Sequence, residues 1–263
     1  MSILLGIVVG LVLGLTGAGG SILAVPLLMA GLAWPLTQAA PIALLAVAAA
    51  AALGTYLAWR RHYVRYRAAT LMSIVGTLTS PLGLHAAERL PAAALSLVFA
   101  VILGIAAIRL LLQSLDKGAD GDTHLGRLCR YDPVSGRLVW TWLSGSVLAA
   151  IGALTGFLSG LLGVGGGFFI VPALRAATEL TMQAAIATSL MTIALTSLGT
   201  VAIAAIVGRD IPVLVALPFV LGSLLGMAAG RWLAPKLPGV RLQQGFALLM
   251  LLVAAGMALH GLA

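Results

Sequence analysis

Two glycine-rich stretches are the part of this sequence best suited to bind a ligand. The first covers residues 16–21 and the second residues 162–167, and a Val-Pro pair follows each of them. Glycine lets a ligand approach the backbone closely, and the unbonded amides at the start of a helix together carry about half a positive charge. Such a helix start binds oxyanions without a basic side chain. The two stretches therefore predict a binding site for a small anion.

Hydroxyl side chains form a second polar feature, found only in the second half of the chain. Four threonines recur there every four residues with two serines beside them, so their hydroxyls form a stripe on a helix over residues 180–207. Such hydroxyls either line a cavity or bond to the carbonyl four residues earlier in their own helix. The residues are Thr188, Ser189, Thr192, Thr196, Ser197 and Thr200.

Two glutamines occupy matching places shortly after the glycine stretches, Gln38 in the first half and Gln183 in the second. An amide in this place can donate to an anion, cap a helix or bridge two helices. The predicted substrate-binding residues are Thr16, Gly17, Gly19, Gly20, Ser21, Gln38, Gly163, Gly165, Gly166, Gly167, Gln183, Thr188, Ser189 and Thr192. We expect no catalytic residue, metal or cofactor, because Ser159 lies in no nucleophile motif and Cys129 has no base beside it.

The composition requires these residues to lie in a bilayer. Of 263 residues, 61% are hydrophobic and 8% are charged, and the mean hydropathy is +1.13. A soluble domain carries about a quarter charged residues. The net charge of +8 is better explained by arginines in loops beside the membrane than by nucleic-acid binding. The chain is therefore predicted to be an all-α polytopic membrane protein.

The apolar runs differ in length. At about 1.5 Å per helical residue, roughly 20 residues cross the hydrocarbon core. The runs 36–59, 67–86 and 91–113 meet this length, whereas 3–15 and 20–33, on either side of the first glycine stretch, are too short to cross comfortably. We therefore expect each half to contain a broken pair of short helices and three full transmembrane helices.

A charged segment divides the chain into two similar halves. We assign a first membrane repeat to residues 1–113, a cytoplasmic linker to 114–139 and a second membrane repeat to 140–263. A shift of 146 residues places nine residues of the first half on identical residues of the second. The first members of these pairs are Gly6, Gly10, Gly14, Leu15, Gly17, Gly19, Gly20, Val25 and Pro26. Gly6, Gly10, Gly14 and their partners, spaced every four residues, are typical of close helix packing.

The number of segments per half decides the orientation of the repeats. A broken pair that dips in and returns, or that crosses twice, gives an odd number of segments and an inverted repeat, whereas a single crossing gives parallel halves. Inversion places 13 Lys and Arg residues on one side and leaves Arg89 and Arg209 on the other, but the parallel arrangement divides them 10 to 5. The charges favour two inverted repeats, with the basic loops 60–67 and 114–139 in the cytoplasm.

The glycine stretches also resemble those of a known family. Gly14-Leu15-Thr16-Gly17-Ala18-Gly19-Gly20, its counterpart at 160–167, the Val-Pro pairs and Ala187-Thr188-Ser189 are similar to motifs of the TauE/SafE membrane permeases. The resemblance covers nearly the whole chain and implies movement of sulfite or other small sulfur-containing anions across the bacterial inner membrane. One departure is that the first half has Ile42-Ala43-Leu44 where the second has Ala187-Thr188-Ser189, which makes the expected cavity asymmetric.

Residues and resemblance together predict a secondary transporter, most simply an exporter of sulfite or a small organosulfonate that works by alternating access between two rocking bundles. The expected partners are the small anion and the lipid bilayer, without nucleic acid, and the chain is not expected to be an enzyme. Two alternatives remain open at this point: a permease for another small solute, and a membrane scaffold protein that transports nothing.

Overall fold

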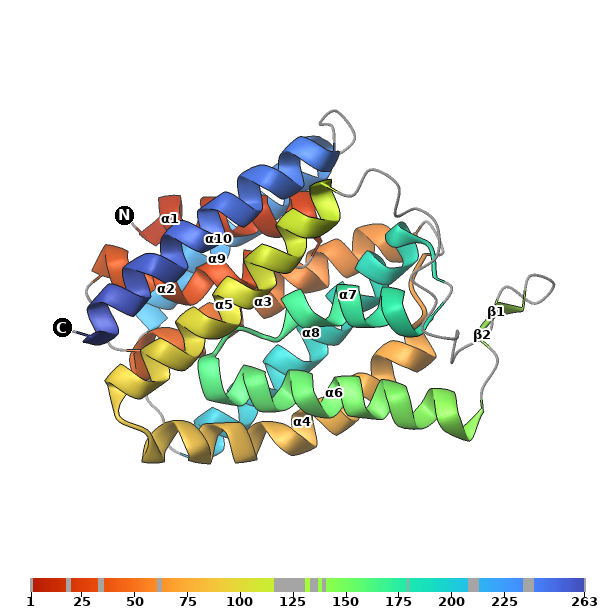
Figure 1. The fold of residues 1–263 in the computed structure, drawn as a ribbon, viewed down its shortest axis with the longest axis horizontal. Helices are drawn as coiled ribbons and strands as arrows, with labels where there is room; N and C mark the ends of the chain where they lie inside the picture. The colour runs from red at the N-terminus through yellow and green to blue at the C-terminus, as the bar shows by residue number, and fades with distance from the viewer. Residues whose placement is uncertain are drawn as a thin grey trace.

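The computed structural model is a bundle of helices with one small two-stranded hairpin at one end (Figure 1). The structure describes residues 2–17, 20–32, 36–60, 63–115, 131–132, 137–138, 141–178, 180–207, 213–233 and 239–262. Its elements are α1 (Ser2–Thr16), α2 (Gly20–Leu32), α3 (Leu36–Trp59), α4 (Tyr66–Arg89), α5 (Ala92–Leu115), β1 (Tyr131–Asp132), β2 (Arg137–Leu138), α6 (Trp142–Leu162), α7 (Gly167–Ala177), α8 (Met182–Ile206), α9 (Val213–Leu233) and α10 (Gly239–Leu262). Most of the predicted linker lies outside the described residues.

The outer surface of the bundle is apolar, as a lipid environment requires. Among the described residues, the segments Gln38–Trp59, Trp142–Leu162, Gln183–Ile206 and Ala216–Leu233 are long and apolar enough to cross a membrane. Large hydrophobic side chains are exposed at helical spacing on α4, α5, α9 and α10. They include Ile74, Leu78, Leu82, Val101, Ile105, Leu112, Leu217, Leu221, Leu225, Leu248 and Leu252. The prediction of an all-α polytopic membrane protein is confirmed.

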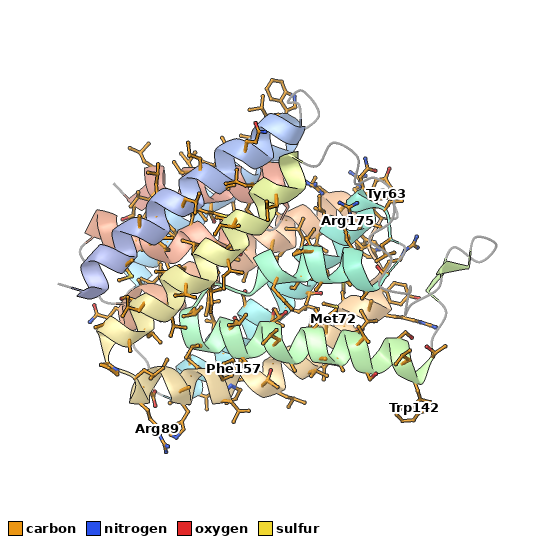
Figure 2. The ribbon with its side chains drawn as sticks, in the orientation of Figure 1. Tyr63, Met72, Arg89, Trp142, Phe157 and Arg175 are labelled. Carbon is orange, nitrogen blue, oxygen red and sulfur yellow. The ribbon has the colours of Figure 1, made fainter. Side chains whose placement is uncertain are left out.

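The two broken pairs are antiparallel hairpins. In the first, Gly20 at the start of α2 lies against Val9 and Leu13 of α1, and Gly31 near its end lies against Leu5. α2 thus returns to the end of the bundle where α1 began. In the second pair, α6 starts at Trp142 and α7 ends beside Arg175, and both residues lie at the same end of the bundle (Figure 2).

The second hairpin corrects one detail of the expected architecture. We predicted two short helices in each pair, but α6 has 21 residues and is long enough to cross a bilayer by itself. The glycine-rich break is therefore reached only after α6 has passed deep into the bundle. The apolar run 140–162 is already this long, but the prediction extended the pattern of the shorter first hairpin to both halves.

The glycines spaced every four residues pack helices of one half against helices of the other. α1 lies along α9, and a methyl group at each of its three ridge glycines would meet α9 backbone. The contacts are Gly6 with Phe219, Gly10 with Ser223 and Gly14 with Met227. α6 lies along α4 in the same manner, through Gly152 with Met72, Gly156 with Gly76 and Gly160 with Ser80. The packing role predicted for these glycines is confirmed.

Equivalent helices of the two halves contact each other in opposite directions. Along α3 and α8, Ala58 packs with Ala187 and Gly54 lies against Leu190, so the helices run antiparallel. α5 and α10 also contact each other, and their colours in Figure 1 run in opposite directions. The halves are therefore interleaved around these pairs, and they do not form two separate bundles.

Antiparallel contact between equivalent helices is the relation that an inverted repeat requires. The labelled side chains agree with this relation, because Arg175 and Tyr63 lie at one end of the bundle and Arg89 lies at the other (Figure 2). The parallel arrangement would have placed Arg175 with Arg89. The orientation of the two halves in a bilayer stays a prediction.

The ridge contacts predict that adding a single methyl group at this interface would push α4 and α6 apart. The added Cβ in Gly156→Ala would meet the backbone of Gly76, and overpacking of this kind costs about 1–3 kcal/mol. Gly145→Ala is the matched control on the same helix, since nothing lies within 4 Å of a Cβ there. Unfolding in detergent should show a lower midpoint for Gly156→Ala only, and equal midpoints for the two variants would contradict this packing.

Candidate functional site

The second glycine stretch reverses the chain inside the bundle. Gly163, Gly165 and Gly166 have φ angles of 69°, 72° and 63°, and the whole break from α6 to α7 is buried. Side chains are strained at such angles, so glycine is required here. The amide of Gly163 donates to the carbonyl of Ser159 over 2.9 Å and closes α6. The predicted break before a short helix is confirmed.

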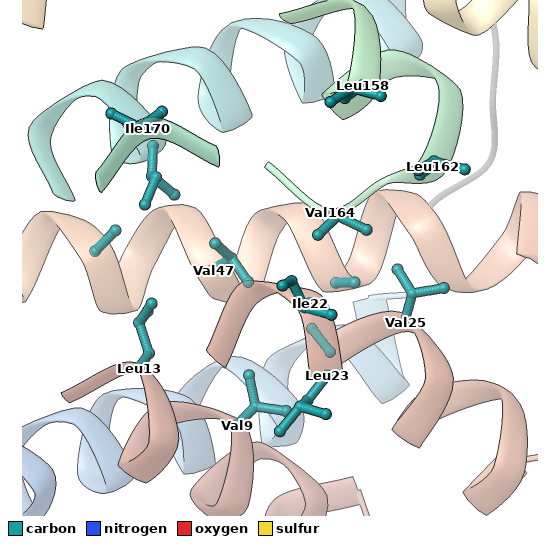
Figure 3. Close-up of a cluster of buried hydrophobic side chains, with 14 of the residues drawn as sticks. Val9, Leu13, Ile22, Leu23, Val25, Val47, Leu158, Leu162, Val164 and Ile170 are labelled. Carbon is teal, nitrogen blue, oxygen red and sulfur yellow. The ribbon is translucent and has the colours of Figure 1, made fainter. Parts of the chain in front are cut away.

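This break lies deep between the central helices. Gly165 faces Val47 and Ile193, which lie close to the middle of α3 and of α8. Figure 3 shows Val164 of the break facing Ile22 of α2, with Val47 nearby. The start of α7 is therefore surrounded by protein at the centre of the bundle, where a backbone amide cannot bond to bulk water.

The start of α7 has the geometry of an anion-binding helix end. Its N-cap residue Gly166 is left-handed and the helix that follows is right-handed, a change that turns successive amides toward one side. Within the described part of the chain, no side chain caps this end. The amide of Phe169 is not free, because it donates to the carbonyl of Gly166 over 3.2 Å. The first amides of α7 thus provide donors and a partial positive charge without any basic residue.

Ser197 also lies at this break, although it is not among the predicted binding residues. We placed it only in the hydroxyl stripe. Its side chain is fully buried, and its Oγ would lie 2.7 Å from a Cβ added to Gly165. Sequence spacing alone could have placed it on the face of Ile193, four residues earlier, but could not show that this face meets the break.

The first glycine stretch is organised similarly as far as the structure describes it. Gly17 has a φ of 76°, and its amide donates to the carbonyl of Leu13 over 2.7 Å. The hydroxyl of Thr16 donates to the carbonyl of Val12 over 2.8 Å. Ser21 is fully buried in the first turn of α2. Gly19, a predicted site residue, lies outside the described residues. Gly17 is also packed against Ile186 of α8.

The threonine stripe is satisfied mostly within its own helix. The hydroxyls of Thr192, Thr196 and Thr200 donate to the carbonyls four residues earlier at 3.0, 2.6 and 2.8 Å. Ser189 donates to the carbonyl of Ile186 at 2.8 Å. Of the two interpretations of the stripe, these bonds favour the local one.

Thr188 has a different role from the other threonines of the stripe. Its Oγ1 accepts a hydrogen bond from the backbone N–H of Arg65 at 3.1 Å, which ties α8 to the connection between α3 and α4.

The two glutamines predicted to bind the anion lie apart. Gln38 and Gln183 are both exposed, in the first turns of α3 and α8, and these antiparallel helices start at opposite ends of the pair. The structure therefore does not bring the two glutamines to one anion.

The bundle is closed around the breaks. A cavity lined by Ile22, Phe99, Ile102, Leu103, Leu162 and Val164 has a volume of about 10 Å³. That volume is at the lower limit for one water molecule, and its walls are apolar. Among the described residues, the polar residues that are buried as a whole are all serines and threonines. The donors available to a buried ligand are thus amides and hydroxyls.

The bond between Thr188 and Arg65 can be tested by two substitutions. Thr188→Val removes the acceptor of the Arg65 amide and should lower the free energy of unfolding by about 1 kcal/mol. Thr188→Ser keeps the hydroxyl and should lower it much less. Chemical unfolding of the purified protein measures both, and an equal loss in the two variants would mean that the hydroxyl bond contributes nothing.

The chain is similar to known proteins over nearly its whole length. Residues 2–257 match the family model described as sulfite exporter TauE/SafE. Two proteins of Xylella fastidiosa, each named a probable membrane transporter protein, are similar over most of their length. The one from strain Temecula1 is 31% identical over 94% of this chain and 89% of its own length, and the one from strain 9a5c is 30% identical over the same shares.

A more distant relative has the same kind of name. The probable membrane transporter protein YunE of Bacillus subtilis is 25% identical over 89% of this chain and 88% of its own length. No solved structure matches the chain.

Proposed function

The chain belongs to the TauE/SafE family of membrane transporters, and from this premise we propose that it exports sulfite or a small organosulfonate across the bacterial inner membrane. The observation that carries the proposal is the buried break from Gly163 to Gly166, where α7 begins in the middle of the bundle. A helix start in this position stabilises an anion and offers little to a cation. The family and the relatives' names support a transporter, and they argue against an enzyme.

The charge of the substrate follows from the donors at the break. The free energy of removing an ion from water rises with the square of its charge, and no buried cation among the described side chains offsets it. A partial charge of about one half at the helix start balances a monoanion far better than a dianion. We therefore propose that sulfite crosses as hydrogensulfite, which carries its proton with it, and that organosulfonates cross as monoanions.

Transport requires the closed bundle to open to each side in turn. The bodies that move are proposed to be α1 with α9 and α4 with α6, because their glycine ridges place backbone against backbone and resist sliding. This division differs from two sequence halves that rock as separate bundles. The crossing of α3 and α8 lies between the two bodies, and the break at Gly165 contacts both of these helices.

Uptake of radiolabelled sulfite into proteoliposomes tests transport directly. Gly165→Ala places a Cβ against Ser197 Oγ in a left-handed residue, so it should lower the initial rate about tenfold or more. Gly145→Ala, with nothing within 4 Å, should transport like the wild type. Monodispersity in detergent reports whether each variant is folded.

Each outcome of this assay distinguishes the alternatives. Sulfite uptake by the wild type, lost in a folded Gly165→Ala variant, supports the proposal. The absence of any solute uptake would favour a membrane scaffold, and uptake of a neutral solute with no competition by sulfite would favour a different permease.

The pH dependence tests the charge of the substrate. At constant total sulfite, the hydrogensulfite fraction falls as pH rises through the second pKa of sulfurous acid, so the initial rate should fall in proportion. Methanesulfonate stays a monoanion over the same range, and its uptake should be nearly constant. A sulfite rate independent of pH would contradict transport of the protonated form.

A further inference from the structure

One buried hydroxyl at the centre of the bundle has no hydrogen-bond partner. Ser197 Oγ is fully buried and unpaired among the described residues. A helical serine usually bonds to a carbonyl of the preceding turn, as Ser189 does on the same helix. Buried hydroxyls are rarely left unpaired, because they lose their bonds to water and gain nothing in return. This serine is therefore an exception that needs a cause.

The unpaired hydroxyl faces the glycine break. A methyl group on Gly165 would lie 2.7 Å from Ser197 Oγ and 3.5 Å from the side chains of Val47 and Ile193. The hydroxyl thus lies beside the break, and the two other side chains near Gly165 are aliphatic and cannot accept its hydrogen bond. A side chain at Gly165 would occupy the space next to Ser197 Oγ.

We infer that Ser197 is a direct ligand of the transported anion, its hydroxyl donating to one oxygen while the first amides of α7 donate to another. The inference deepens the proposed function and rests on it. The donors lie on two elements, α8 and the start of α7, so a ligand with two acceptor oxygens on one small centre can bond to both. Hydrogensulfite and methanesulfonate have this geometry and the single charge that the site favours.

A pair of variants on one helix separates this role from a structural one. Ser197→Ala removes the unpaired hydroxyl. Thr196→Val is the matched control, because the Thr196 hydroxyl already donates to the carbonyl of Thr192 over 2.6 Å. The measurement is the concentration of sulfite, and of methanesulfonate, that gives half-maximal thermal stabilisation and half-maximal uptake. Loss of a hydrogen bond to a charged ligand should raise this concentration about 10- to 100-fold in Ser197→Ala.

A second readout comes from the protein without anion. Since Ser197→Ala removes an unpaired buried hydroxyl, its melting temperature without anion should equal or exceed that of the wild type. A merely structural serine would instead lower the melting temperature and leave the affinity for the anion unchanged.

The outcomes separate the two proposals. Unchanged half-maximal concentrations in a transporting Ser197→Ala variant would overturn the role of Ser197 and leave sulfite export standing. A wild type that neither binds nor moves sulfite and methanesulfonate would overturn the proposed function and the inference with it.

Discussion

A bilayer interior offers no water to a backbone amide, so an interrupted helix is stable there only when protein or ligand surrounds the interruption. The structure meets this constraint by enclosing the break from Gly163 to Gly166 between α3 and α8. Left-handed glycines make the reversal, and the apolar side chains around it exclude lipid. The result is a helix start that keeps its donors and its dipole in surroundings of low dielectric constant, where both act most strongly on a charge.

The glycine ridges make this enclosure possible. Without side chains at positions such as Gly10 and Gly156, α1 and α6 approach the backbones of α9 and α4 in the opposite half. Each hairpin thus packs against the other half of the chain, so both halves hold the breaks in place. Interleaving of this kind links any movement of one hairpin to a helix of the other half.

The sequence predicted those features that depend on local chemistry. Glycines spaced every four residues predicted the packing ridges, and apolar length predicted the helices at 36–59, 67–86 and 91–113. Features that depend on three-dimensional contacts were not predictable in this way. The exposure of Gln38 and Gln183 is of this kind. Ser197 was left out of the predicted binding residues for the same reason, because only the fold brings it next to Gly165, 32 residues away in the chain.

The central claim is that an anion binds at the start of α7 in the middle of the bundle. Selenite is a heavier analogue of sulfite, and its selenium scatters anomalously, so diffraction from crystals soaked in selenite locates the bound anion directly. The account predicts an anomalous peak within hydrogen-bond distance of Ser197 Oγ and the first amides of α7. A peak only at the arginine-rich surface loops, from a protein that still moves sulfite, would contradict it.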